Sequence, residues 1–199
     1  SIVKKKYVVT TDSKHNFPAS ENLLNRQFSV DRPTEVWVSD ITYIKVARGW
    51  MYLTVILDLY DRKVVGWAMS ESLKARQTVI PAWNMAIKNR PVTKGLIFNS
   101  DRGVQYACHE FRRRLKSTLQ VKQSMSRKGD CWDNAVAEAF FKILKSEMVN
   151  HFSFPFVKVA KQKIFEFIEG WYNRKRQHAF LGYLSPEEFY QQNWSIKLA

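Results

Sequence analysis

The chain has 199 residues, 45% of them hydrophobic, and no low-complexity tract, so it can bury one well-packed core and is not disordered throughout. Its 32 Lys and Arg outnumber its 18 Asp and Glu and give a net charge of +14, which is typical of a protein that binds a polyanion. No stretch approaches the roughly 20 apolar residues of a membrane-spanning helix, and the N-terminus has no apolar signal-peptide core, so we expect a soluble cytoplasmic protein.

The cysteines give no sign of a disulfide framework or a zinc site. Cys108 and Cys131 stand singly, and the four histidines do not complete a zinc-ligand pattern. We therefore expect reduced thiols and no structural metal.

Residues 1–33 differ in composition from the rest of the chain. They are polar and basic, contain Pro18 and Pro33, and carry one short apolar patch at Leu23 and Leu24. Proline and polar residues of this kind are typical of linkers. We interpret the region as a tail or linker that forms no core of its own.

Three β-rich runs follow. They extend from Glu35 to Val46, from Trp50 to Tyr60 and from Lys63 to Ser70. The connections between them are short and contain Gly49 and Asp61, which favour turns. The pattern predicts an antiparallel three-stranded meander.

Helices and short strands alternate after the meander. Apolar spacing predicts helices from about Ala75 to Asn89 and from about Tyr106 to Ser117, with strands from Gly95 to Phe98 and from Thr118 to Gln123. A glycine-containing loop, Ser124 to Asp130, precedes a third helix. The β-β-β-α-β-α-β-α order predicts an α/β fold of ribonuclease H-like topology, with a mixed sheet flanked by helices.

The C-terminal part is predicted to be helical. A long helix is expected from Pro155 to about Asn173, and the run SPEEF is typical of the start of a short final helix. We expect three units: a linker (1–33), a ribonuclease H-like core (34–152) and a helical extension (153–199). The apolar face of the long helix comprises Val157, Ala160, Ile164, Ile168 and Trp171.

Three carboxylates stand in settings where an acid is unusual. Asp40 interrupts an alternating strand pattern, Asp101 follows an apolar run before a turn, and Glu138 lies early in the third helix. Each alone is more simply a cap, a turn residue or a solvated charge. Together they fit one fold, on a central strand, an adjacent turn and a neighbouring helix. Carboxylates brought together repel one another unless a cation neutralises them, so the pattern predicts a Mg²⁺ or Mn²⁺ site for cutting nucleic acid.

Basic residues between Arg90 and Asp130 far outnumber acidic ones. Such a patch neutralises phosphates without reading bases. The triplet Arg112 to Arg114 fits a solvated helix face equally well, whereas Arg127 and Lys128 lie in the loop that leads to the third helix.

On that helix, Lys142 and Lys145 share a face with Glu138 by i, i+4 and i+7 spacing. An ordinary Glu–Lys helix pair, worth about 0.3 kcal/mol, gives the same pattern. We favour a role in DNA binding for both lysines. The full set of predicted DNA contacts is Arg102, Arg127, Lys128, Lys142, Lys145, Arg174 and Arg176.

Three further residues have two interpretations each. Trp132, next to the third helix, is either part of the core or stacks on an unpaired base. Asn134 is most simply a helix cap. His178 lies beside a basic loop, and we expect it to be structural or solvated, with no catalytic role. The tryptophans expected in the core are Trp50, Trp67 and Trp83.

Four segments are highly specific when taken together: VWVSDITYI, NSDRGVQY, SMSRKGDCWDNAVAEAFF and YNRKRQHAFLGYLSPEEF. Through them the chain, from about Asn22 to Glu188, resembles the integrase-like DDE transposases of bacterial insertion sequences, most closely the insertion-sequence-three family. By this resemblance Asp40, Asp101 and Glu138 form a metal-binding catalytic triad.

The spacing of the triad departs from the family in one respect. The chain has 36 residues between Asp101 and Glu138, one more than is usual for the family. Because the loop and helix around Glu138 match the family, we place the extra residue within 117–121, where it should not displace Glu138.

The resemblance implies two-metal phosphoryl transfer. Two Mg²⁺ or Mn²⁺ ions held by the triad would activate a water and then a DNA 3′-hydroxyl, without a covalent protein–DNA intermediate. The implied partners are transposon ends, target DNA and further copies of the chain, with no membrane partner and a bacterial, nucleoid-associated location. The stretch before residue 29 looks like the end of a helix-turn-helix region, so end recognition would reside upstream of this chain.

Two alternatives remain open. A retroelement-type integrase or a ribonuclease H-like nuclease would share the triad, although RKGDCWDNA and HAFLGYLSPEEF favour the insertion-sequence assignment. A catalytically inactive DNA-binding relative would keep the positive charge without needing the triad.

Overall fold

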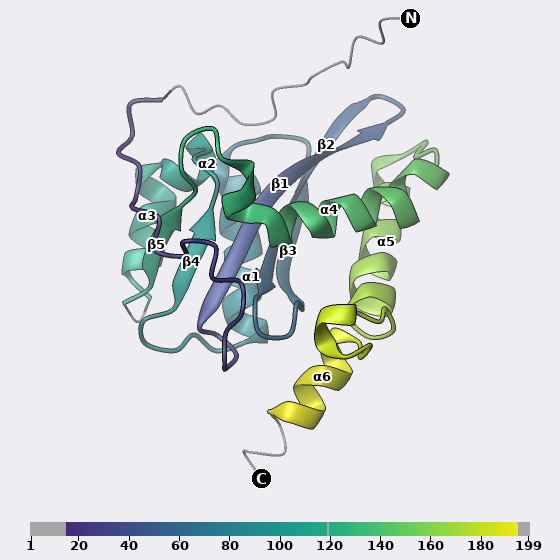
Figure 1. The fold of residues 1–199 in the computed structure, drawn as a ribbon. Coiled ribbons are helices and arrows are strands. Elements are labelled where there is room, and N and C mark those ends of the chain that lie inside the picture. Colours follow the sequence, from purple (N-terminus) through teal and green to yellow (C-terminus); the bar gives the residue numbers. More distant parts are fainter. Residues whose placement is uncertain (1–14, 119, 195–199) are drawn as a thin grey trace, which may run out of the picture.

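Alternating apolar residues form a five-stranded mixed sheet in the computed structural model, which describes residues 15–118 and 120–194 (Figure 1). The strand order is β3-β2-β1-β4-β5, so the longest strand lies in the middle. The strands are β1 (Val36–Val46), β2 (Gly49–Asp58), β3 (Val64–Ser70), β4 (Ile97–Ser100) and β5 (Lys122–Met125).

The pairing of the strands confirms the predicted meander. β1, β2 and β3 pair antiparallel, whereas β4 pairs parallel to β1 and β5 pairs parallel to β4. Parallel neighbours need crossover connections, and helices supply them here. In the β1–β4 ladder, Trp37 lies opposite Phe98 and Val38 lies opposite Asn99.

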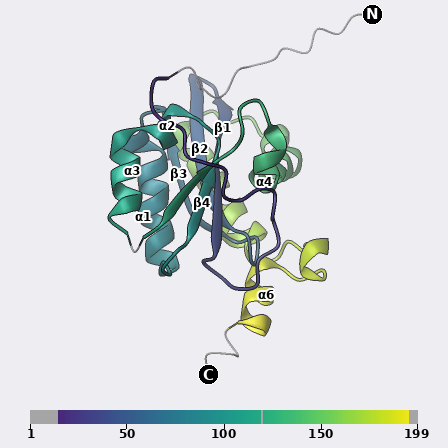
Figure 2. The ribbon, with the colours of Figure 1, turned by 60° about the vertical axis from the view of Figure 1, so that its left-hand side comes forward.

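Helices cover both faces of the sheet. α1, α2 and α3 lie on one face, and α4 and α5 lie on the other (Figure 2). No helix in the described part of the chain is long and apolar enough to cross a membrane. The α-helices are α1 (Val79–Asn89), α2 (Val104–Ala107), α3 (His109–Lys116), α4 (Ala135–Glu147), α5 (Val157–Phe165) and α6 (Pro186–Asn193).

The face under α1 and α3 is closed by aromatic rings. Trp83 of α1 contacts Trp37 and Phe98 edge-on, with ring centroids 5.6 and 5.5 Å apart, and all three are fully buried. Close approach of α1 depends on Gly66 of β3, where an added Cβ would lie 2.3 Å from the carbonyl oxygen of Ala82. This side of the sheet is therefore a dry packing surface.

The opposite face carries the other half of β1. Val36, Val38 and Ile44 point to this side and pack in one cluster with Phe140 and Leu144 of α4. Because side chains alternate along a strand, an even-numbered residue between them shares their side. Asp40 is such a residue, so the sequence places a carboxylate under α4.

Residues 15–33 contain no helix or strand but are attached to the sheet. Leu24 is buried in the core, the backbone N–H of Leu23 donates to Ser124 Oγ at 2.9 Å, and that of Met125 donates to the carbonyl of Glu21 at 3.3 Å. The dark purple segment in Figure 1 accordingly runs in front of β5 and β4. Residues 1–14 lie outside the described part, and the domain boundary at residue 33 stays a prediction.

Two boundaries between Asp101 and Lys122 differ from the prediction. The predicted helix from Tyr106 to Ser117 is two helices, α2 and α3, because Cys108 has an extended backbone with ψ of 149°. The predicted strand from Thr118 begins only at Lys122, because Thr118 accepts a turn hydrogen bond from the N–H of Val121. The segment 117–121, where the extra residue was placed, thus lies in the connection between α3 and β5.

The predicted C-terminal helix is present, but its second half is wider than expected. α5 continues as a π-helix, Glu166–Tyr172, in which the N–H of Asn173 reaches the carbonyl of Ile168. The wider turn rotates later side chains off the original face. Trp171 is therefore 45% exposed and Tyr172 is buried, whereas Trp171 was predicted to be on the apolar face. The predicted start of the final helix is confirmed by a capping box between Ser185 and Glu188.

Candidate active site

The strand register brings Asp40 and Asp101 together. Val38 pairs with Asn99, and continuing this parallel register by two residues sets Asp40 beside Asp101, just past the end of β4. Each carboxylate is steadied by a nearby backbone N–H: Asp40 Oδ1 accepts from Ile41 at 2.8 Å, and Asp101 Oδ1 accepts from Gly103 at 2.9 Å. The register of the two strands therefore brings two acids that are far apart in sequence close enough for the charge of Asp101 to act on Asp40.

Glu138 reaches the same region from α4. The helix crosses the sheet in front of β1 (Figure 1), and Glu138 lies in its first turn, on the exposed side. The surrounding protein removes enough water to raise the pKa of its carboxyl. The third predicted acid is thus on the helix that packs over Asp40.

Electrostatics links the three acids. Burial raises the pKa of Asp40 well above its usual value, and the charges of Asp101 and Glu138 raise it further, whereas the N–H of Ile41 and the charge of Lys145 act in the opposite direction. When like charges raise the pKa of a carboxyl in this way, a cation bound among them would stabilise its charged form.

The donor set suits a hard divalent cation, but the acids are not in ligand geometry as they stand. In the described ranges, 15–118 and 120–194, no three His, Cys, Asp or Glu side chains are grouped so that they could hold a metal ion. Carboxylate oxygens are nevertheless the ligands that Mg²⁺ and Mn²⁺ prefer. The mutual repulsion at Asp40 is the feature that a cation would relieve.

A buried tyrosine, which the sequence patterns did not single out, supports the two aspartates. Tyr106 of α2 shares a 2.8 Å hydrogen bond with Ser39 Oγ, and Ser39 Oγ also donates to the carbonyl of Val55 at 2.8 Å. Burial raises the pKa of Tyr106, and the charges of Asp40 and Asp101 add to this effect. The hydroxyl therefore stays protonated and ties the turn after Asp101 to β1. Tyr106 is the last residue of the segment NSDRGVQY, and this position is the sequence feature that could have identified it.

Asn134 was predicted to cap α4, and it does occupy the N-cap position, but without the expected capping hydrogen bond. Its side chain makes no capping hydrogen bond, and its Nδ2 donates instead to the carbonyl of Ser39 at 3.0 Å. The preceding Asp133 is fully buried, and its own carbonyl accepts from Asn99 Nδ2 at 3.3 Å. The base of α4 is thus joined to β1 and β4, next to both aspartates, by amide side chains that no spacing rule identifies.

The basic residues predicted to contact DNA from α4 and from the preceding loop differ in their exposure and in whether they have partners within the chain. Lys142 and Lys128 are exposed, and Lys145 is half-buried with its charge acting on Asp40. Arg127 is half-exposed, but its Nε donates to Asp133 at 3.1 Å and its Nη2 donates to Asn25 at 2.9 Å. A phosphate would have to share Arg127 with these partners.

The other predicted contacts lie on both sides of the acids. Arg102 follows Asp101 directly and donates from Nε to the carbonyl of Ser126 at 2.7 Å. Arg174 is exposed, whereas Arg176 forms a 2.9 Å ion pair with Glu147 at the end of α4. The structure therefore gives Arg176 a partner within the chain.

The aromatic and histidine predictions are partly corrected. Trp83 is buried as expected, but Trp50 is 53% exposed near the start of β2, so its assignment to the core is wrong. Trp132 is 68% exposed, which leaves its ring accessible. His178 packs edge-on against Tyr172, and burial together with the charges of Arg176 and Arg62 lowers its pKa to about 4.

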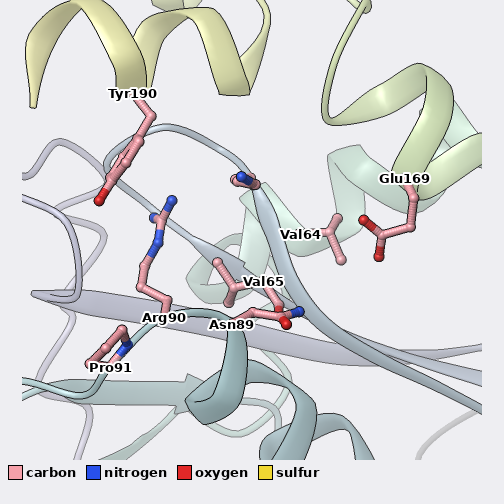
Figure 3. Close-up of a pocket in the computed structure, with 8 residues that line it drawn as sticks. Val64, Val65, Asn89, Arg90, Pro91, Glu169 and Tyr190 are labelled. Carbon is pink, nitrogen blue, oxygen red and sulfur yellow. The ribbon is translucent and has the colours of Figure 1, made fainter. Parts of the chain in front are cut away.

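A cavity of about 340 Å³ lies away from the acids, between β3, the end of α1 and α6 (Figure 3). Its polar side chains have partners within the chain: Arg90 binds Asp58 and Asp61 and stacks on Tyr190. The remaining lining residues are Lys63, Val64, Val65, Asn89, Pro91 and Glu169. We therefore assign the candidate active site to the carboxylates rather than to this cavity.

The chain is similar to integrases and transposases. Residues 30–131 and 138–194 match two models described as integrase core domain. An insertion element IS600 protein of Shigella sonnei is 41% identical over 94% of the chain and 68% of its own length. Transposase InsF for insertion sequence IS3A of Escherichia coli K12 is 39% identical over 95% of the chain and 65% of its own length. The chain thus spans about two thirds of the length of the curated relatives it matches.

Solved structures identify the fold. The catalytic core of HTLV-2 integrase in complex with magnesium has a TM-score of 0.59 at 17% identity and covers 79% of this chain and 96% of its own. The catalytic domain of Mos1 mariner transposase has a TM-score of 0.58 at 15% identity and covers 69% and 71%. These catalytic cores have the ribonuclease H-like fold, so the predicted fold class is confirmed. The family models and the curated relatives show that the chain belongs to the integrase core domain family, among the transposases of the insertion-sequence-three type.

Proposed function

We propose that the chain is the catalytic domain of a DNA transposase, which cuts DNA at insertion-sequence ends and joins the new end to target DNA. The observation that carries the proposal is the placement of Asp40 beside Asp101 in the β1–β4 register, under the helix that bears Glu138. The raised pKa of Asp40 supports it, because Asp101 and Glu138 both contribute to that rise.

The three carboxylates would hold two Mg²⁺ or Mn²⁺ ions. Bound there, the ions would lower the pKa of the attacking hydroxyl and stabilise the leaving oxygen of an in-line displacement. Asp40 and Asp101 are set by the sheet, and Glu138 approaches from the helix, so the acids can close on a cation from different sides. Tyr106 holds the Asp101 turn against β1 through Ser39 and limits how far the two aspartates can separate.

The positive residues around the acids would hold the DNA backbone. Lys142 and Lys128 are exposed, and Lys145 is close enough to act on Asp40, so a phosphate at the acids would lie next to positive charge. Arg102 and Arg174 complete the accessible set. Arg127 and Arg176 could join it only by sharing their present carboxylate partners.

Recognition of the DNA ends is proposed to lie outside this chain. The chain covers about two thirds of the length of its curated relatives, which leaves room in those proteins for a separate DNA-reading region. We propose that the assembly is a homo-oligomer on DNA and that an upstream helix-turn-helix region reads the ends.

Strand transfer with labelled DNA ends and Mn²⁺ tests the proposal. Asp40→Asn, Asp101→Asn and Glu138→Gln should each lower cleavage and joining by about a thousandfold or more, because each removes a ligand charge while keeping its shape. Asp31→Asn, an exposed aspartate before β1, is the matched control and should retain full activity. Unchanged cleavage in the three variants, with DNA binding intact, would favour a catalytically inactive DNA-binding relative.

The salt dependence of DNA binding tests the lysines. Lys142→Ala should reduce affinity and lower the slope of log K against log salt by about one, because one phosphate contact is lost. Lys88→Ala is a suitable control, since Lys88 is exposed on α1 at the opposite face of the sheet. Equal slopes for the two variants would exclude a phosphate contact at Lys142.

A further inference from the structure

The base of α4 is held by a buried carboxylate that has no part in the proposed chemistry. Asp133 lies in the short 3-10 turn Cys131–Asn134 that leads into α4, and its side chain is fully buried. Two residues of the N-terminal segment donate to it: Arg26 Nε to Oδ1 at 2.9 Å and Asn22 Nδ2 to Oδ2 at 2.8 Å. A buried carboxylate with charged donors is a strong anchor, because removing one partner leaves the other without compensation.

The same carboxylate also holds the loop before α4. Oδ2 accepts the backbone N–H of Arg127 at 2.8 Å and its Nε at 3.1 Å. Burial would raise the pKa of Asp133, but the hydrogen bonds from Arg127 and Arg26 outweigh it and leave the pKa lowered, so Asp133 is charged at neutral pH. We call Asp133, Asn22, Arg26 and Arg127 the Asp133 cluster.

Arg26 is the central cation of the Asp133 cluster. Besides Asp133 it pairs with Asp130, whose side chain caps the 3-10 turn by accepting from the N–H of Trp132. One arginine of the N-terminal segment thus binds both the acid that caps the turn and the acid within it. Glu138 follows five residues after Asp133, in the first turn of the helix that this turn starts.

We propose that Asp133 and Arg26 are positioning residues for Glu138. By fixing the turn before α4, they set where the helix begins and therefore where its first-turn carboxylate points. The segment 22–26 then belongs to the support of the metal site rather than to a passive linker. The inference rests on the proposed metal-binding role of Glu138. Groups that orient metal ligands from outside typically change metal affinity by about 10- to 100-fold when removed.

Calorimetric titration of the metal-free chain with Mn²⁺ tests the inference without relying on activity. Arg26→Ala should raise the Kd for Mn²⁺ by about tenfold, and Arg26→Lys should restore part of the loss. Arg32→Ala is the matched control, because Arg32 lies in the same segment and makes only a loose 3.8 Å contact with Glu35. Its Kd should equal that of the wild type.

A double-mutant cycle separates positioning from a general loss of structure. If Arg26 acts through Glu138, Arg26→Ala should weaken Mn²⁺ binding little or not at all once Glu138→Gln is present. Fully additive losses, or an unchanged Kd in Arg26→Ala, would overturn the inference. Should Arg26→Ala fail to fold by circular dichroism, Asn22→Ala, which removes a single hydrogen bond, replaces it, with a rise in Kd of about twofold or more expected.

The cycle also distinguishes this inference from the proposed function. If Glu138→Gln alone leaves Mn²⁺ binding unchanged, Glu138 is not a ligand, and both the triad and its positioning fail. If Glu138→Gln weakens binding and Arg26→Ala does not, the triad stands and only the role of the Asp133 cluster is refuted.

Discussion

Two groups of buried or partly buried carboxylates have opposite electrostatic surroundings in this fold. On the α1 side, Asp58 and Asp61 are fully buried against Arg90, with ion-pair distances of 2.8 and 2.6 Å. On the α4 side, Asp40 is surrounded by the charges of Asp101 and Glu138. The first group includes a cation, Arg90, whereas the second brings like-charged carboxylates together.

The difference is visible in the protonation of the central residues. Burial disfavours the charged form of Arg90, but the charges of Asp61 and Asp58 outweigh it and raise its pKa, so that group stays ionised. At Asp40, burial and like charges act together and raise the pKa. The α1 group therefore contains its own counter-charge, whereas burial and like charges both oppose the charged form of Asp40. Four measurements follow from this contrast.

Arg90→Ala should have the largest effect. It leaves two buried aspartates without a counter-charge, so the free energy of unfolding should fall by about 3–5 kcal/mol in urea denaturation. Arg76→Ala is the control, because Arg76 forms an exposed 2.7 Å pair with Glu110 that water and salt screen, so its loss should leave the unfolding curve nearly unchanged. Similar losses in the two variants would remove the basis of the contrast.

Divalent cations should act only on the α4 group. Mn²⁺ at about 100 times its Kd should stabilise the wild type by about 2.7 kcal/mol, because it binds the folded chain and not the unfolded one. Asp40→Asn should abolish this gain, which thermal melting with and without Mn²⁺ would detect. A gain retained in Asp40→Asn would mean that the ion binds elsewhere.

Asp40→Asn should make the metal-free protein more stable, by about 1 kcal/mol. Since the folded pKa of Asp40 lies above its unfolded value, the wild type holds the proton longer when folded and loses stability as pH rises from about 3.9 to the raised value. The advantage of the variant should therefore be absent at low pH, grow through that window and stay constant above it. A Tm difference that is flat with pH would contradict this account.

A separate pH effect is expected at His178, because burial disfavours the charged form of its imidazole. Its pKa is lowered to about 4 from 6.5, first by burial and then by the charges of Arg176 and Arg62. The unfolded chain binds a proton below pH 6.5 and the folded one does not, so stability should fall between pH 6.5 and 4. His178→Gln should flatten that part of a Tm-against-pH curve, without altering the response to Mn²⁺.

Much of the sheet could be predicted from sequence because its signals are local. Alternation identified the meander, and the apolar runs before Asp101 and after Glu35 located the strands of the site. Boundaries set by tertiary contacts were missed. The break at Cys108 comes from its extended backbone, and the late start of β5 comes from the turn between Thr118 and Val121. The π-helix before Asn173 changes the helical period, which the apolar spacing does not reveal.

The acids of the candidate site were predictable, whereas their support was not. Asp40, Asp101 and Glu138 are unusual in their local settings, which is a property of the sequence. Asn134 has an ordinary capping sequence, yet its partner is the carbonyl of Ser39. Asp133 likewise binds residues about a hundred positions away, and only the folded chain reveals such pairs.

The ladder between β1 and β4 has a consequence for how the protein can change in evolution. Asp40 and Asp101 each follow two residues after the ladder pair Val38 and Asn99, so turns between the two strands can gain or lose surface residues without altering that register. Glu138 has no such ladder and depends on side-chain contacts at the base of α4. Length variation should therefore be tolerated in the turns between the aspartates, and beyond Asp101 in turns that leave α4 in place, such as the connection between α3 and β5.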